Sequence, residues 1–301
     1  MKYHSGRRKT VFYLNRESMK KQKAISLEAA SEGFLAACGA RRLSPNTIED
    51  YTRTINKFIL YVGDMAMNNV TSNQVTAFLA SLKGVKAKTV LNRHIGLAAF
   101  WTWALKEQYV DRHIVRQVEK PRAQVIIVEP FTEVEIRALL SAVRNNPERD
   151  RAIIYLLLDC GIRASELVGL KREDIDLTNF RITVRGGKGN KDRMLPFSKK
   201  TASVLFRYLS HSNGKPFPIS RTSLTSLMER LGKRAGVKNC HPHRFRHTFA
   251  ITYLRNGGDG YTLQELLGHS TMEMVRRYLH IAQVDLERAH RRASPIENWD
   301  L

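Results

Sequence analysis

Apolar side chains recur at helical spacing through the first third of the chain. The segment SPNTIEDYTRTINKFILYV repeats with a period of about 3.6 residues, at Ile48, Tyr51, Ile55, Phe58, Ile59 and Val62. Its Ser-Pro start marks where the helix begins. Three more helical segments are SLEAASEGFLAACGA, TSNQVTAFLASLKG and AKTVLNRHIGLAAFWTWALKEQ. Four helices without a strand signal predict an all-α domain over residues 24–118.

The pattern changes after this region. The segment EKPRAQVIIVEP has a proline near each end and no helical cap, which predicts an interdomain linker over residues 119–130. Next, a capping box formed by Thr132 and Glu135 predicts the start of a helix. The segment NFRITVRGGKGNKDRMLPF predicts two short strands around a glycine-rich turn, and it is the only clear β signal.

Further helical segments surround this hairpin and predict an α+β domain over residues 131–292, followed by a tail at 293–301. The predicted fold class is therefore mainly α with a small β-hairpin or sheet, in two domains. Residues 1–23 hold eight Lys and Arg against one acid, which predicts a basic N-terminal arm.

Charge is the informative feature of the composition. Fifty Lys and Arg face 28 Asp and Glu, a formal net charge of +22, and such an excess favours a polyanion such as nucleic acid. A membrane surface fits less well, because no helix pairs a basic face with a broad aromatic one. The chain has no long apolar run and no secretory signal, and its three cysteines are far apart. We therefore expect a cytoplasmic protein with reduced thiols.

The stretch HPHRFRH concentrates candidate chemistry in residues 241–247. His243 and His247 are four residues apart, as zinc ligands on a helix would be, but Arg244 and Arg246 would repel a cation. A plain DNA-facing helix would explain the arginines and leave His243 without a role. Neither alternative accounts for the distant stretch LGHS, which holds His269.

Three residues elsewhere in the chain each have an ordinary explanation when taken alone. Tyr278 follows His269 by nine residues in LLGHSTMEMVRRYLH, and a half-buried tyrosine usually finds a partner for its hydroxyl. Arg163, in CGIRASEL, could simply pair with Glu166. Lys188, in GGKGNKD, could be an exposed lysine on a turn.

Their ordered combination resembles the tyrosine recombinase (phage integrase) family, and most closely its Xer-type and mobile-element members. The resemblance covers residues from about 24 to 290 and rests on GIRxSEL, the GKGNK hairpin, HxxR, GHS and the final Tyr. It implies that Arg163 and Arg246 hold the scissile phosphate and that Lys188 is the general acid. It further implies that His243 and His269 are active-site histidines, that Tyr278 is the nucleophile and that Glu166 braces the site.

The family also implies an activity and partners. Such an enzyme cleaves and rejoins double-stranded DNA through a 3′-phosphotyrosyl intermediate and a Holliday junction, without metal, cofactor or ATP. It works as a homo-tetramer, alone or with a paralogous recombinase, and its two domains clamp the duplex. A type IB topoisomerase-like transferase and a non-catalytic DNA-binding regulator are the alternatives. Within HPHRFRH we expect Arg244 on the DNA-facing side and His247 as a packing residue.

Overall fold

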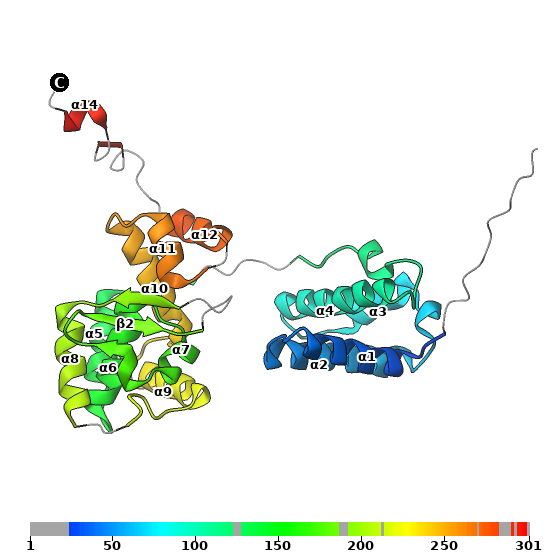
Figure 1. Ribbon diagram of the computed structural model, residues 1–301, viewed down its shortest axis with the longest axis horizontal. Coiled ribbons are helices and arrows are strands. Elements are labelled where there is room, and N and C mark those ends of the chain that lie inside the picture. Colours follow the sequence, from blue (N-terminus) through cyan, green and yellow to red (C-terminus); the bar gives the residue numbers. More distant parts are fainter. Residues whose placement is uncertain are drawn as a thin grey trace, which may run out of the picture. The chain divides into compact units, whose positions relative to one another are not determined.

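The chain forms two compact units, divided after residue 125, in a computed structural model (Figure 1). The structure describes residues 24–122, 128–186, 192–211, 214–269, 271–282, 290–291 and 294–299. The predicted basic arm, the central part of the predicted linker and the hairpin tip with Lys188 lie outside the described residues. Each unit is described below by itself.

All the elements of the first unit, within its described residues, are helices, apart from an isolated β-bridge between Ser26 and Ala66. Its elements are α1 (Leu27–Ala40), α2 (Pro45–Val62), η1 (Met67–Asn69), α3 (Ser72–Ser81), α4 (Ala87–Lys106) and η2 (Ile114–Gln117). Ser44 caps α2 by accepting from the backbone N–H of Thr47 at 3.2 Å, and Pro45 supplies the fixed φ that suits a first helical turn. The predicted helices are therefore present. Serine or threonine side chains cap the starts of α1, α2 and α3, whereas α4 begins without a side-chain cap.

Aromatic side chains fill the core of this unit. Phe58 meets both Phe78 and Trp101 edge to face, with ring centroids 5.3 and 5.8 Å apart. All three rings are buried, together with Leu97 and Phe100 on α4. Because α2 and α4 both contact α1 and α3, one apolar centre joins the four helices.

The second unit places a small sheet among helices. Its helices are α5 (Glu133–Ser141), α6 (Pro147–Cys160), α7 (Ala164–Gly169), η3 (Arg172–Asp174), α8 (Lys199–Ser210), α9 (Arg221–Ala235), α10 (Pro242–Arg255), α11 (Gly260–Leu267), α12 (Glu273–Ala282) and α14 (Pro295–Asn298). The mainly helical fold class with a small sheet is thus confirmed.

The sheet is antiparallel in the order β1 (Ile175–Asp176), β2 (Arg181–Val184) and β3 (Arg193–Pro196). Ile182 on β2 lies opposite Leu195 on β3, and both are fully buried. Strands β2 and β3 match the predicted hairpin. Strand β1 was not predicted, because two residues are too few to show an alternating pattern.

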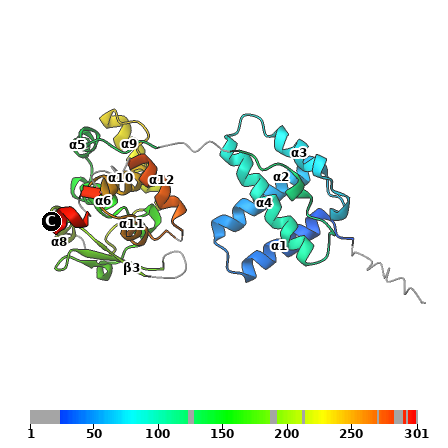
Figure 2. The ribbon, with the colours of Figure 1, turned by 90° about the horizontal axis from the view of Figure 1, so that it is seen from above.

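Helix α10 lies near the middle of the second unit and packs against both α6 and α12 (Figure 2). Its residues belong to two apolar clusters: Phe245 joins the large core around α6, whereas Ile251 joins a smaller core with Leu263 and Val275. The N-terminal and C-terminal halves of α10 therefore pack into different parts of the unit. Across the described residues, no helix is long and apolar enough to cross a membrane.

Two glycines with left-handed backbone allow a test of packing beside the site. Gly161 ends α6 at φ +58°, and a Cβ there would come within 2.4 Å of the Phe249 ring. We expect Gly161→Ala to lower the free energy of unfolding by roughly 1–2 kcal/mol for the left-handed backbone and a further ~1–3 kcal/mol for overpacking. Urea unfolding followed by far-ultraviolet circular dichroism measures this loss.

Gly236→Ala is the matched control. Gly236 ends α9 at φ +69°, but open space surrounds the position of its Cβ. In this variant the free energy of unfolding should fall only by the roughly 1–2 kcal/mol that the left-handed backbone costs, without the loss from overpacking. Equal losses in the two variants would contradict the packing argument.

Candidate active site

Arg163 lies where α6 ends and α7 begins. Gly161 turns the chain, and Arg163 becomes the N-cap residue of α7, with Glu166 in its first turn. The backbone N–H of Arg163 donates to Glu166 Oε2 at 2.9 Å, and its Nη1 donates to Oε1 at 2.8 Å. The carboxylate thus holds both the backbone and the guanidinium of Arg163, whose side chain stays one-third exposed.

Arg246 lies on α10 and is almost completely buried, with 2% of its surface exposed. Its Nη1 donates to the Gly161 carbonyl at 2.8 Å, and its Nη2 donates to the Leu267 carbonyl at 2.5 Å. Burial lowers the pKa of Arg246 to about 9, with the nearby Arg163 charge adding to this effect. The guanidinium therefore remains protonated at neutral pH.

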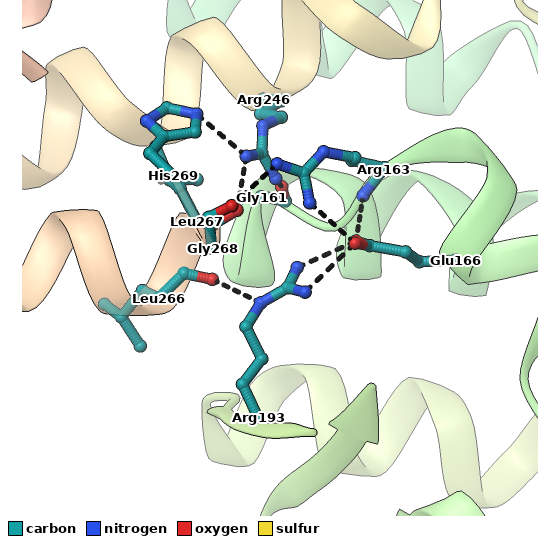
Figure 3. A network of polar contacts seen from close by, with 9 residues as sticks. All are labelled: Gly161, Arg163, Glu166, Arg193, Arg246, Leu266, Leu267, Gly268 and His269. Atoms are coloured by element: carbon teal, nitrogen blue, oxygen red, sulfur yellow. Dashed lines mark hydrogen bonds and ion pairs between the residues drawn. The ribbon is translucent and has the colours of Figure 1, made fainter. Parts of the chain in front are cut away.

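Three guanidiniums converge on the C-terminal end of α11 (Figure 3). The carbonyl oxygens at this end of a helix have no partner within the helix and carry its negative dipole charge. Three consecutive carbonyls each accept from one arginine: Leu266 from Arg193 Nε at 2.9 Å, Leu267 from Arg246 Nη2 and Gly268 from Arg163 Nη2 at 3.0 Å. The end of α11 therefore fixes the spacing of all three cations.

A single carboxylate balances this charge among the described contacts. Glu166 accepts from Arg163 and from Arg193, and it is the only acid paired with the three guanidiniums in the described part of the chain. Burial alone would raise its pKa, but the hydrogen bonds from Arg193 and Arg163 lower it to about 2. The excess positive charge suits an anion.

A cavity of about 220 Å³ opens beside these cations. Arg163, His243 and Arg246 line it, and Arg221 at the start of α9 contributes a further guanidinium. Burial lowers the pKa of His243, and the charge of Arg246 lowers it further. His243 is therefore neutral at neutral pH, where it can accept a proton.

His269 follows α11 and contacts Arg246. Its Nε2 lies 3.0 Å from Arg246 Nη2, and since a guanidinium only donates, this bond assigns the imidazole proton to Nδ1. Burial and the charges of Arg246 and Arg163 lower the pKa of His269 to about 4, so the ring is neutral at neutral pH. Its buried Nδ1–H has no hydrogen-bond partner among the described residues.

Tyr278 lies on α12 and is 2% exposed. Its ring stacks on His269 with centroids 6.1 Å apart and meets the edge of His247 at 5.3 Å, while His247 contacts His243 at 4.4 Å. Burial raises the pKa of Tyr278, although Arg246 and Arg163 act in the opposite direction. Its hydroxyl is also without a partner among the described residues, so none of them supplies the hydrogen bond that the ordinary explanation for this tyrosine requires.

The structure therefore brings six of the candidate residues into one region, where each contacts another of them directly or through a residue between them. They are Arg163, Glu166, His243, Arg246, His269 and Tyr278. The remaining candidate, Lys188, lies outside the described residues. Buried polar atoms without partners are rare in proteins, and here two of them, His269 Nδ1 and Tyr278 Oη, belong to this region.

The expectation for Arg244 was wrong. This side chain is buried and stacks on the ring of Phe131, with its Cζ 3.9 Å from the ring centroid. It pairs with Glu135 at 3.1 Å and donates to the backbone carbonyls of Glu129 and Lys238. Two residues along a helix point to nearly opposite sides, so Arg244 anchors the start of the second unit while Arg246 faces the site.

Two arginines in this region were not predicted from the sequence. Arg193 is on β3, where it shares the inward face with the buried Leu195, whereas Met194 between them is exposed. A charged residue at an inward strand position was the signal that could have identified it. Arg221 carries no comparable signal.

No group of three His, Cys, Asp or Glu that could hold a metal ion occurs in the described ranges.

Comparison with known proteins identifies the family to which the chain belongs. Residues 129–284 match the family described as Phage integrase family, and residues 31–111 match Phage integrase, N-terminal SAM-like domain. Tyrosine recombinase XerA of Thermococcus kodakarensis is 32% identical over 268 residues, which are 84% of this chain and 91% of that protein. Tyrosine recombinase XerC of Staphylococcus carnosus is 35% identical over 239 residues, 73% of this chain and 79% of that protein.

Solved structures show the same fold. The Tn1549 transposon integrase in complex with transposon right end DNA has a TM-score of 0.73 at 18% identity, covering 86% of this chain and 99% of that one. A lambda integrase dimer bound to a COC′ core site has a TM-score of 0.72 at 17% identity, covering 85% of this chain and 77% of that one. The described residues define a mainly helical protein with an arginine-lined cavity and, in the same region, a buried tyrosine. The chain belongs to the phage integrase family, as an Xer-like tyrosine site-specific recombinase.

The buried position of Arg244 generates a stability prediction. Arg244→Ala should lower the free energy of unfolding by about 3–5 kcal/mol, because Glu135 would lose its buried partner. Urea unfolding of the full chain followed by circular dichroism measures the change. Arg137→Ala removes an exposed pair with Glu133 and should cost no more than about 1 kcal/mol. A stable Arg244→Ala variant with weakened DNA binding would instead restore the DNA-facing interpretation.

The low pKa of Glu166 generates a prediction about pH. A carboxylate whose pKa falls from 4.5 to about 2 on folding stabilises the fold above 4.5, and this stability is lost as the pH falls toward 2. Glu166→Gln should therefore be less stable than the parent at neutral pH, by up to about 3 kcal/mol. The difference should shrink in acid.

Urea unfolding in a series of buffers from neutral pH to about pH 3 measures this change across the window of carboxylate titration. Glu133→Gln, which alters an exposed side chain, is the control and should show almost no difference at any pH. A difference between Glu166→Gln and the parent that stays constant down to the lowest pH would contradict the assignment.

Proposed function

We propose that this recombinase cleaves and rejoins DNA strands through a covalent bond between Tyr278 and a 3′-phosphate. The observation that carries the proposal is the pairing of an arginine-lined cavity with a buried tyrosine hydroxyl that lacks a partner among the described residues. A phosphodiester in the cavity would supply the missing negative charge. The oxygens of the same phosphate could also accept from the Nδ1–H of His269, which has no partner among the described residues.

Arg163 and Arg246 would bind the nonbridging oxygens of the scissile phosphate. Each guanidinium carries five N–H groups, and the described contacts occupy two on Arg163 and three on Arg246. The remaining N–H groups can donate to the charge that develops on the pentacoordinate phosphorus. Fixed donors of this kind contribute on the order of 3 kcal/mol each to transition-state stabilisation.

In the cleavage step, Tyr278 Oη would attack phosphorus as the bond from phosphorus to the 5′-oxygen breaks. The phenol proton would pass to neutral His243, and the Nδ1–H of His269 would donate to the phosphate. Lys188 would protonate the departing 5′-oxygen as the general acid, as the family resemblance implies. Rejoining is the reverse of this step. The phosphotyrosyl bond conserves the energy of the phosphodiester, so ATP is not consumed.

Double-stranded DNA is the proposed partner. The formal net charge of +22 supports it, and so do the similar folds of the Tn1549 integrase, solved in complex with transposon right end DNA, and of lambda integrase, solved bound to a core site. We assign core DNA binding to residues 24–118, a linker to 119–130 and catalysis to 131–292. Two strand exchanges through a Holliday junction, within a homo-tetramer, would complete recombination.

The nucleophile can be tested by replacing Tyr278. Tyr278→Phe should bind DNA as the parent does, yet form no SDS-resistant protein–DNA adduct, because the attacking oxygen is missing. The substrate is a duplex selected from a randomised pool by binding to the chain and then nicked on one strand, so that the cleaved fragment diffuses away. Gel electrophoresis in SDS measures the adduct.

Tyr261→Phe is the control, because Tyr261 lies on the neighbouring α11 but is 75% exposed. This variant should form the adduct at the parent rate, and EDTA should leave the parent adduct unchanged. An adduct that persists in Tyr278→Phe, or that EDTA abolishes in the parent, would refute the proposal.

A further inference from the structure

Arg163, Arg193 and Arg246, which donate to the carbonyls at the end of α11, form with Glu166 what we call the α11 network. Among its three guanidiniums, Arg193 is the one that does not line the cavity. Its side chain is 12% exposed, and all three of its nitrogens have acceptors. Nη1 and Nη2 donate to the two oxygens of Glu166 at 3.0 and 2.8 Å, and Nε donates to the Leu266 carbonyl at 2.9 Å. Arg193 therefore contacts parts of the site without reaching the space for the phosphate.

The two parallel bonds to Glu166 fix where that carboxylate lies. Glu166 in turn orients Arg163, through its bonds to the Arg163 backbone and guanidinium. Among the influences that lower the pKa of Glu166, the hydrogen bond from Arg193 is the largest. A bidentate pair sets an angle as well as a distance, which one ammonium group cannot do.

The third bond fixes the end of α11. Leu266 is followed by the two carbonyls that hold Arg246 and Arg163, and then by His269. Gly268 lies against Arg193: its φ is +62°, and a Cβ there would be 3.2 Å from Arg193 Nη1. Strand β3 is thereby tied to the segment that positions the site.

We propose that Arg193 is a positioning residue of the recombination reaction, which holds Glu166 and the end of α11 so that Arg163, Arg246 and His269 converge on one phosphate. The inference rests on the proposed function. Without Arg193, the Glu166 carboxylate would have only Arg163 as its described ion-pair partner and would draw that guanidinium away from the cavity. Arg193 thus prevents the bracing acid from competing with the substrate for Arg163.

The experiment measures adduct formation in single turnover at saturating DNA, on the nicked duplex described above, alongside equilibrium binding of the same duplex. Arg193→Gln and Arg193→Lys should each slow the adduct by about 100-fold, the usual effect of a small misplacement of catalytic groups. Their dissociation constants for DNA should stay within about threefold of the parent value, since phosphate contacts elsewhere supply most of the affinity. Arg193→Lys keeps the charge and the strand, so it remains informative if Arg193→Gln folds poorly.

A double-mutant cycle with Glu166→Gln tests the route of the effect. Arg193 also holds the end of α11, so Arg193→Gln combined with Glu166→Gln should be slower than Glu166→Gln alone. If part of the effect passes through Glu166, the combined loss should be clearly smaller than the product of the two single losses. Independent roles would multiply the two losses. A residue needed only for stability would not produce this coupling in the rate at saturating DNA.

Arg149→Lys is the matched control. Arg149 donates through two nitrogens to the buried Asp150 at 2.9 and 2.8 Å, and it lies at the start of α6, outside the α11 network. It should form the adduct at the parent rate. Parent-like rates in Arg193→Lys and Arg193→Gln, or multiplied losses in the cycle, would overturn this inference alone. No adduct from the parent chain would overturn the proposed function and the inference with it.

Discussion

The site depends on the negative end of one short helix. Three consecutive carbonyls at the end of α11 each accept from a different guanidinium, and one carboxylate holds two of those guanidiniums from the other side. Like charges so close together would repel, and burial would disfavour them further. The helix end and Glu166 offset that cost only in part. The remaining positive charge makes the cavity suited to an anion such as a phosphodiester.

The same charges act on the groups that carry protons. Burial lowers the pKa of His269 and the arginines lower it further, so the ring is neutral, whereas for Tyr278 the arginines oppose the rise in pKa that burial causes. Both groups keep a buried polar atom without a partner among the described residues, which costs stability in the absence of a ligand. Unpaired donors and acceptors of this kind are expected where a substrate completes the hydrogen bonding. Stability and function therefore make opposing demands on this part of the fold.

Helix α10 directs two arginines that are two residues apart into different surroundings. Arg244 is held by Glu135, by Phe131 and by backbone carbonyls near the start of the second unit. Arg246 is held by Gly161, Leu267 and His269 at the site. Because α10 runs through the middle of the unit, the packing that orders Arg244 also fixes the direction in which Arg246 points.

The sequence by itself determined the helices and the hairpin, because periodicity and caps such as Ser44 and Thr132 act over a few residues. Ordered motifs also identified the residues that come together, Arg163, Glu166, His243, Arg246, His269 and Tyr278, although their catalytic roles stay predictions. Only the tertiary structure decided that Arg244 is buried and that Arg193 joins the site. Each of those side chains meets partners far away in the chain, such as Glu135 and Glu166, and no local pattern encodes which distant group a charged side chain will reach.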